Sequence, residues 1–419
     1  MAERLLQTAV TLVGSAGVRP GAPADAIEGV VPGIVVEPAS VDAVGGLLAW
    51  ASREKLSVLA RGSGTKLGWG PAPRTIDVLL STAKLNAVVA HRHGDLTATI
   101  QAGATLGDVN RTLARHRQWI PLDPPFADRA TIGGLVATND SGPRRHRYGA
   151  PRDLIIGIEF VRADGLLAKG GGIVVKNVAG YDLPRLLTGS FGSLGVIVTA
   201  TFKLYPQTPA SGTLVVDLKD PNDLATLTGK VLMSHLTPTA LEFATHPLRL
   251  ILRFESIEAS VQQQSQTAAR LIAECGFNAR SVPGSEEDRF WSSHDVFAEE
   301  DRCALLKVSV LPTELAATLA LIEQLAGPRG YAAVGRAGAG VFQLCITGDV
   351  QLQKRVINGL RDALPLGRGS AVVVKSPPEL RTHVDVWGPL GDGLTLMKSV
   401  KQQFDPVGVL SPGRGPGGL

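Results

Sequence analysis

The stretch Val58-Leu59-Ala60-Arg61-Gly62-Ser63-Gly64-Thr65-Lys66 carries an apolar strand pattern directly into a glycine-rich loop. Its two glycines allow consecutive backbone amides to turn toward a ligand without interference from a Cβ atom. We therefore predict a phosphate-binding nest formed by Arg61, Gly62, Ser63, Gly64, Thr65 and Lys66. The dinucleotide-binding fingerprint would require glycine at position 67, where Leu67 stands, and the P-loop sequence is absent. The loop therefore matches neither the Rossmann nor the P-loop pattern.

A second glycine-rich region lies between residues 130 and 149. We expect the N–H groups of Gly133 and Gly134 to be free at a helix start and to face a pyrophosphate, with the Thr131 and Ser141 hydroxyls beside them. The alternative is a turn-rich connector that holds no ligand. The candidate binding residues of this region are Thr131, Gly133, Gly134, Thr138, Asn139, Ser141, Gly142, Arg145, Tyr148 and Gly149.

A third segment, Val175-Lys176-Asn177-Val178-Ala179-Gly180-Tyr181-Asp182, leads into Gly189-Ser190-Phe191-Gly192-Ser193-Leu194-Gly195-Val196-Ile197. In residues and order, the three segments resemble the FAD domain of the vanillyl-alcohol oxidase/PCMH flavoprotein family over residues 30–205. The resemblance implies that the first two loops wrap the pyrophosphate of FAD. It also implies that the strand containing Gly195 and Ile197 reaches the adenine or the flavin through backbone groups.

The same resemblance implies an α+β fold in three parts. A two-subdomain PCMH-type FAD-binding domain is expected over residues 1–210, followed by a smaller α+β cap domain over residues 211–380. A C-terminal tail over residues 381–419 is expected to return to the FAD-binding domain. Some relatives attach flavin covalently through a histidine after the first glycine loop, but Thr65 stands there. We therefore expect noncovalent FAD.

Within that family, the chain is most similar to the FAD-binding subunits of bacterial glycolate oxidases. The segments that carry this similarity are Lys176–Asp182 and Asp385-Val386-Trp387-Gly388-Pro389. Such a subunit implies oxidation of a small 2-hydroxy acid, glycolate to glyoxylate, together with a catalytic flavoprotein subunit and an iron–sulfur subunit. Two alternatives stay open: a self-sufficient FAD-dependent oxidoreductase acting on a hydroxy acid or sugar, and a non-enzymatic scaffold with a vestigial flavin site.

The C-terminal half departs from the pattern of fully catalytic relatives. Those relatives carry a Glu-His-Gly-x-Gly element and a Gly-Asp-Gly-Asn-x-His element, and neither is present; they also usually have asparagine where Ser411 stands. Oxidation of a hydroxy acid needs a base and a cation for the carboxylate, roles for which His294 and Arg253 can be considered. We expect instead that His294 is a partly exposed cap residue and Arg253 a solvated strand residue. The catalytic residues therefore stay unassigned.

Composition narrows the remaining classes of function. A length of 419 residues favours two domains. A content of 44% hydrophobic and 19% charged residues is typical of an ordinary soluble protein. A net charge of +4 without a dense Lys/Arg block argues against nucleic acid. Cys275, Cys303 and Cys345 are far apart, so we predict neither a metal site nor a disulfide framework. We expect a cytoplasmic protein, whose only contact with the inner membrane is peripheral and made through the complex.

Local patterns also predict the elements that position the loops. Ser40 and Thr105 are predicted to cap helices. Strands are predicted over Thr75–Ser81 with alternating burial, over Asp153–Val161 and Gly172–Val175 as a hairpin, and over Gly195–Leu204 with one face buried.

Overall fold

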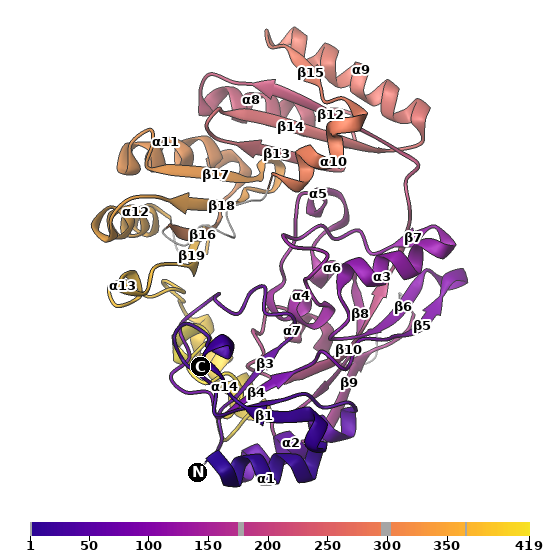
Figure 1. Ribbon diagram of the computed structural model, residues 1–419. Coiled ribbons are helices and arrows are strands. Elements are labelled where there is room, and N and C mark those ends of the chain that lie inside the picture. The colour runs from indigo at the N-terminus through magenta and orange to yellow at the C-terminus, as the bar shows by residue number, and fades with distance from the viewer. Residues whose placement is uncertain (1, 175–179, 295–302, 365–366) are drawn as a thin grey trace. The chain divides into compact units, whose positions relative to one another are not determined.

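The computed structural model describes residues 2–174, 180–294, 303–364 and 367–419, so the predicted motif residues Val175–Ala179 lie outside the described part. The chain forms two compact units (Figure 1). Unit 1 comprises residues 1–141, 150–207 and 392–419, and unit 2 comprises residues 142–149 and 208–391. Val384 and Val386, which the sequence assigned to the tail, are buried in the core of unit 2.

The first sheet of unit 1 contains a parallel three-stranded core. Its order is β1-β2-β4-β3, with strands Val18–Pro20, Ile34–Val36, Val78–Ser81 and Val58–Arg61. Helix α2 (Val41–Glu54) connects β2 to β3, and its predicted cap is confirmed because Ser40 Oγ accepts a hydrogen bond from the Ala43 N–H. All residues of β4 are buried, so the predicted alternation is wrong. A central parallel strand is covered on both faces and shows no alternation.

The second sheet of unit 1 is antiparallel, with the order β5-β6-β10-β8-β9. Its strands are Val88–Arg92, Thr97–Gln101, Val196–Lys203, Ile155–Val161 and Leu167–Gly171. The predicted half-buried strand is wrong, because β10 is buried on both faces along nearly its whole length. A register shift between Ile197 and Thr199 marks a β-bulge. Consequently Val196 and Val198 pack in the core with α2, whereas Phe202 packs with α3 (Leu106–Leu113) and α4 (Ile132–Thr138).

The hairpin of β8 and β9 ends earlier than the sequence predicted. The second strand is Leu167–Gly171, so a strand over Gly172–Val175 is wrong for its described residues. Gly171 has a φ of +70°, and a Cβ atom there would lie 2.1 Å from the Ile156 carbonyl oxygen. The chain leaves the sheet at a position that only glycine accommodates. The other predicted cap is confirmed, because Thr105 Oγ1 accepts a hydrogen bond from the Asp108 N–H at the start of α3.

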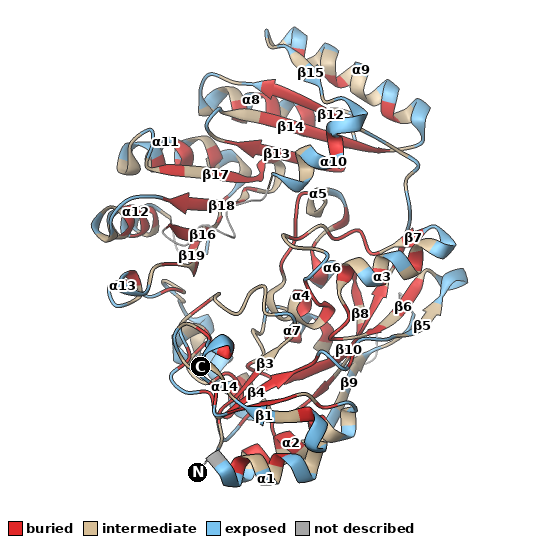
Figure 2. Cartoon of the chain, in the orientation of Figure 1, coloured by how far each residue is buried: buried red, intermediate tan, exposed pale blue. Residues whose placement is uncertain are grey.

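Unit 2 is built on an eight-stranded antiparallel sheet of order β15-β12-β14-β13-β17-β18-β16-β19. In chain order, β12 to β19 are Ala210–Asp217, Ala240–Ala244, Arg249–Ser256, Ala279–Ser281, Ala304–Ser309, Tyr331–Arg336, Val341–Ile346 and Ser370–Lys375. Helices α8 (Pro221–Leu232), α9 (Glu258–Glu274), α11 (Leu315–Ala326) and α12 (Val350–Ala363) cover one face (Figure 1). Alternate strand residues such as Phe243 and Phe254 form the core beneath them. The central strands of this sheet are mostly red in Figure 2, the colour of buried residues.

The C-terminal segment returns to unit 1, as the resemblance implied. Helix α14 (Gly393–Phe404) places Phe404 against Phe160 with ring centroids 6.0 Å apart. Residues 409–411 then run beside β3: the Val58 N–H donates to the Val409 carbonyl, and the Ser411 N–H donates to the Val58 carbonyl. The α+β fold with a returning tail is therefore confirmed.

The remaining elements are short or peripheral. They are α1 (Ala2–Val13), β7 (Gln118–Trp119), α5 (Arg145–Tyr148), α6 (Pro151–Leu154), α7 (Leu183–Leu187), β11 (Tyr205–Pro206), α10 (Gly284–Ser292) and α13 (Pro378–Arg381). Among the helices that the structure describes, none combines the length and the hydropathy of a membrane-spanning segment.

Candidate functional site

A cleft in unit 1 joins the first two glycine-rich regions to the start of β10. Its lining combines residues of β3, the first glycine-rich loop, α4 and β10. The predicted site residues that line it are Arg61, Gly62, Ser63, Gly64, Thr65, Lys66, Thr131, Gly133, Gly134, Thr138, Gly195 and Ile197. Segments far apart in the sequence therefore line one cleft.

The first loop presents open backbone donors. The N–H groups of residues 62–66 donate to no other group within the described part of the chain. Gly64 has a φ of +85°, a conformation that side chains resist, and a turn of this kind directs successive amides toward an anion. The loop thus fits the diphosphate of a dinucleotide.

The two loops are held together by contacts between their residues. A Cβ atom on Gly62 would lie 2.0 Å from Thr131 Oγ1, so glycine at this position allows the loops to touch. Lys66 Nζ lies 3.1 Å from Asp140 Oδ2, with side chains only 7% and 6% exposed. This buried ion pair connects the first loop to the residue that follows the C-cap of α4.

The expected free N–H groups at the start of α4 are not found. The Gly133 N–H donates to the Ala102 carbonyl at 2.8 Å, and the Gly134 N–H is directed at Thr131 Oγ1 at 3.4 Å. A Cβ atom on Gly133 would lie 2.8 Å from the Cβ atom of Ala102. The glycine at 133 therefore allows α4 to pack against the residue that follows β6, and residues 62–66 supply the open amides instead.

Six predicted residues do not line the cleft. Asn139 ends α4 with a φ of +48°, and its Oδ1 atom accepts a hydrogen bond from the Arg152 N–H. Ser141 is buried beside Asp140, whose Oδ1 atom accepts the Ser141 N–H. The other four belong to segment 142–149, which packs as part of unit 2. They are Gly142, Arg145, Tyr148 and Gly149.

Sequence reasoning missed several lining residues, which are Thr82, Ala102, Phe191, Gly192 and Arg414. Arg414 is the charged one among them. Its side chain donates to the carbonyls of Leu67 at 2.7 Å and Trp69 at 2.5 Å, and the residue is only 4% exposed. The signal that could have found it is the resemblance of the tail to a segment that returns to the FAD domain.

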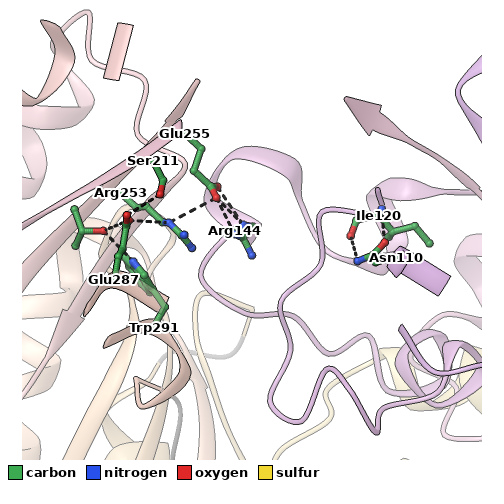
Figure 3. A network of polar contacts seen from close by, with 9 residues as sticks. Asn110, Ile120, Arg144, Ser211, Arg253, Glu255, Glu287 and Trp291 are labelled. Carbon is green, nitrogen blue, oxygen red and sulfur yellow. Dashed lines mark hydrogen bonds and ion pairs between the residues drawn. The ribbon is translucent and has the colours of Figure 1, made fainter. Parts of the chain in front are cut away.

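Unit 2 contains a cluster of buried polar side chains. The cluster lies on the face of the sheet that helices α8, α9, α11 and α12 do not cover. Glu287 accepts hydrogen bonds from Ser211 Oγ and Thr213 Oγ1, both at 2.6 Å, and lies 3.3 Å from Arg253 Nε. Trp291 Nε1 donates to Thr213 Oγ1 at 2.9 Å. Figure 3 shows these side chains converging from β12, β14 and α10.

A bidentate interaction between an arginine and a carboxylate links segment 142–149 to this cluster. Arg144 donates through Nη2 to Glu255 Oε1 at 2.7 Å and through Nε to Oε2 at 3.1 Å (Figure 3). Burial would raise the pKa of Glu255, but the hydrogen bond and charge of Arg144 outweigh it and lower that pKa below 4.5. Glu255 is therefore held as a buried carboxylate.

A third buried acid, Glu242, lies nearby on β13. His294 Nε2 is 3.4 Å from its Oε2 atom, and Arg336 Nε is 3.7 Å from its Oε1 atom. The expectation of a solvated Arg253 is wrong, because its side chain is 8% exposed. His294 is a residue of intermediate exposure, as expected, although its side chain is only 5% exposed. Segment 142–149 packs against β13 and α10 packs against β12, which removes this face from solvent. Burial also lowers the pKa of His146 below 6.5, against an opposing effect of Glu242.

Residues 32–171 match the family described as an FAD binding domain. The chain is 26% identical to "Glycolate oxidase subunit GlcD" of Bacillus subtilis. The alignment covers 92% of this chain and 89% of that protein. The chain is 35% identical to "D-lactate dehydrogenase" of Archaeoglobus fulgidus over 50% of this chain and 47% of that protein. It is also 35% identical to "Glycolate oxidase subunit GlcE" of Escherichia coli over 38% of this chain and 46% of that protein.

Among solved structures, p-cresol methylhydroxylase with substrate bound aligns over 98% of this chain and 96% of its own, with a TM-score of 0.77 and 15% identity. An identity of 15% is too low to indicate an activity, but the TM-score of 0.77 establishes a PCMH-type fold. The cofactor is FAD, as the matched FAD binding domain and a relative named as an FAD-linked oxidoreductase indicate. The chain is an FAD-dependent oxidoreductase.

Proposed function

We propose that this chain is the FAD-binding subunit of a multi-subunit glycolate, or 2-hydroxy acid, oxidase or dehydrogenase. Its partners would be a catalytic flavoprotein subunit and an iron–sulfur subunit, and the reaction would convert glycolate to glyoxylate. The observation that carries the proposal is an FAD cleft in a chain similar to proteins named as glycolate oxidase subunits, GlcD over 92% of this chain and GlcE over 38% of it. We place the complex in the cytoplasm, with any contact at the inner membrane peripheral.

The donors of the cleft suit noncovalent FAD. Open amides at residues 62–66 match the diphosphate, and the side chain at position 65 is threonine, which offers no imidazole for covalent attachment. FAD held in this cleft would store or pass on the electrons that the catalytic flavoprotein takes from the substrate. The role of this chain's own residues is to bind and orient the cofactor.

Onward transfer of electrons points to a partner. The chain has three cysteines, whereas an iron–sulfur cluster is held by four protein ligands. Among the described residues, no group of three or more His, Cys, Asp or Glu side chains is placed to hold a metal ion. An iron–sulfur carrier in the same complex would supply that path.

The two His-bearing elements of catalytic relatives are missing from this sequence. Without them the chain lacks the base those relatives use, so another subunit would take the hydroxyl proton. In unit 2, the charges of Glu255 and Glu287 are instead matched by Arg144 and Arg253. This supports an accessory role.

Anaerobic mixing of the purified, FAD-loaded chain with glycolate tests the proposal. We expect little bleaching of the flavin absorbance with the chain alone, and rapid bleaching after co-expression with a catalytic flavoprotein and an iron–sulfur subunit. D-lactate in a parallel reaction addresses the substrate class. Rapid and complete bleaching of the lone chain would contradict the accessory role.

A second candidate is a self-sufficient oxidoreductase of a hydroxy acid or sugar. The buried pair of Glu242 and His294 favours it, because a carboxylate beside an imidazole stabilises the protonated ring after it accepts a proton. His294→Gln distinguishes the two functions: it would abolish turnover of glycolate by the lone chain under the second candidate. Under the first, the lone chain has no turnover to lose.

A further inference from the structure

The C-terminal residues 401–414 contact both walls of the cofactor cleft. On one side, Arg414 donates to the carbonyls of Leu67 and Trp69 in the first loop. On the other side, Lys401 Nζ donates to the Ser193 carbonyl at 2.8 Å, directly before the cleft-lining strand start. The Ser411 hydroxyl is directed at the Gly192 carbonyl at 3.4 Å. One short segment therefore links walls that are more than a hundred residues apart in the sequence.

This segment has its own rigid framework. The Asp405 carboxylate accepts the N–H groups of Gly408, Val409 and Leu410 at 3.0, 3.0 and 2.7 Å. Lys401 Nζ donates to Asp405 Oδ2 at 2.7 Å, and Asp405 is 2% exposed. A buried carboxylate with four donors holds the turn in a single conformation.

The framework directs the arginine at its end into the cleft. Ser411 and Gly413 have φ values of +47° and +78°, and these left-handed residues turn the chain back toward the first loop. Arg414 is 4% exposed and lines the cleft together with residues 61–67. A guanidinium carries five N–H donors in one plane, a geometry that matches phosphate oxygens.

We infer that Arg414 is a cofactor-binding residue, positioned by residues 401–413, and that this C-terminal segment determines how tightly the chain retains FAD. The guanidinium donates through Nη2 to the loop carbonyls and presents positive charge beside the open amides of residues 62–66. The inference depends on FAD as the cofactor and not on the proposed substrate. Its failure would leave the proposed function standing.

Arg414→Gln tests the charge, because a glutamine amide still donates to carbonyls but is neutral. Apo chain is titrated with FAD, with ADP, which keeps the diphosphate, and with riboflavin, which has no phosphate; flavin or protein fluorescence gives the dissociation constants. We expect FAD and ADP to bind about 10-fold to 100-fold more weakly, as for loss of a charge-assisted contact. Riboflavin binding should not change. Arg414→Lys should recover part of the affinity.

Arg74→Gln is the matched control. Arg74 is exposed and approaches the same segment, with its Nε atom 3.7 Å from where a Cβ atom on Gly413 would lie, but it does not line the cleft. Equal FAD affinity in the Arg74 and Arg414 variants, or an equal loss of riboflavin and FAD, would overturn the inference. If Arg414→Gln does not fold, Arg414→Lys decides, because lysine keeps the charge but not the planar set of donors. A weaker affinity for ADP with an unchanged affinity for riboflavin supports the inference, and equal losses for ADP and riboflavin refute it.

Discussion

The cofactor cleft of unit 1 and the polar sheet face of unit 2 both contain many polar groups. The two regions differ in whether these groups have hydrogen-bonding partners within the chain. In the cleft, the N–H groups of residues 62–66 have no partner among the described residues. In unit 2, Glu255 and Glu287 are matched by Arg144, Arg253 and two hydroxyls. The cleft is therefore built to receive a ligand, whereas the polar face of unit 2 largely satisfies itself.

The two regions should accordingly respond to different substitutions. Recognition through backbone amides tolerates changes of side chain but not a Cβ atom where two loops touch. A network of buried side-chain charges responds most strongly to loss of one partner, because the other charge stays buried.

Arg144→Met should give the largest effect. It leaves the Glu255 carboxylate buried without its two-fold partner, at a cost of about 3–5 kcal/mol in the free energy of unfolding. Urea denaturation measures the change. Arg368→Met is the control, because the ion pair of Arg368 with Glu314 is exposed and contributes at most about 1 kcal/mol. Equal costs for the two variants would show that the network of unit 2 is not critical to its stability.

Gly62→Ala should come next and act on the cleft. Its Cβ atom would lie 2.0 Å from Thr131 Oγ1, and forcing the loops apart costs about 1–3 kcal/mol, or roughly 10-fold to 100-fold in FAD affinity. Fluorescence titration with FAD measures it. Gly94→Ala, with nothing within 4 Å of its added Cβ atom, should bind normally. Unchanged affinity in Gly62→Ala would place the diphosphate elsewhere.

A smaller effect should appear in unit 2 on acidification. Burial lowers the folded-state pKa of His146 below 6.5, so the unfolded chain takes up the proton first. The stability present above pH 6.5 is then lost as the pH falls toward the folded-state pKa, by up to about 1.4 kcal/mol per pH unit. Urea midpoints between neutral and mildly acidic pH, compared with those of His146→Gln, isolate this proton. Parallel pH profiles for the two proteins would contradict the assignment.

The smallest expected effect is a gain from Ser411→Asn. Ser411 has a φ of +47°, and asparagine adopts left-handed backbone more readily than serine. We expect an increase of about 0.5 kcal/mol in the free energy of unfolding. Thermal unfolding of this variant beside Ser411→Ala measures it, and a loss of stability in the asparagine variant would show that packing outweighs backbone preference here.

The features that were predictable from sequence are those that a few neighbouring residues determine. The caps at Ser40 and Thr105 and the loop after β3 each depend on local chemistry. The resemblance added the order of the parts and the return of the tail. Most of the residues that line the cleft were named in this way.

The rest depends on contacts between distant residues. Arg144 and Glu255 are 111 positions apart. The sequence around Arg253 and His294 likewise does not indicate that the side chains of these two residues are buried. The Gly133 N–H was predicted to be free for the same reason. It donates to the carbonyl of Ala102, a residue of another segment. Burial on both faces of β10 likewise depends on distant residues, because one hydrophobic core packs on each face.

The return of the C-terminal segment has a consequence for synthesis. Translation delivers residues 1–207 early, yet the cleft they begin is complete only with Arg414, and β3 gains its last neighbour only with Val409 and Leu410. Unit 2, made in between, has its full set of residues before unit 1 does. Contacts of such long sequence separation form slowly. The nascent chain should therefore retain FAD tightly only after residues 401–414 have emerged from the ribosome.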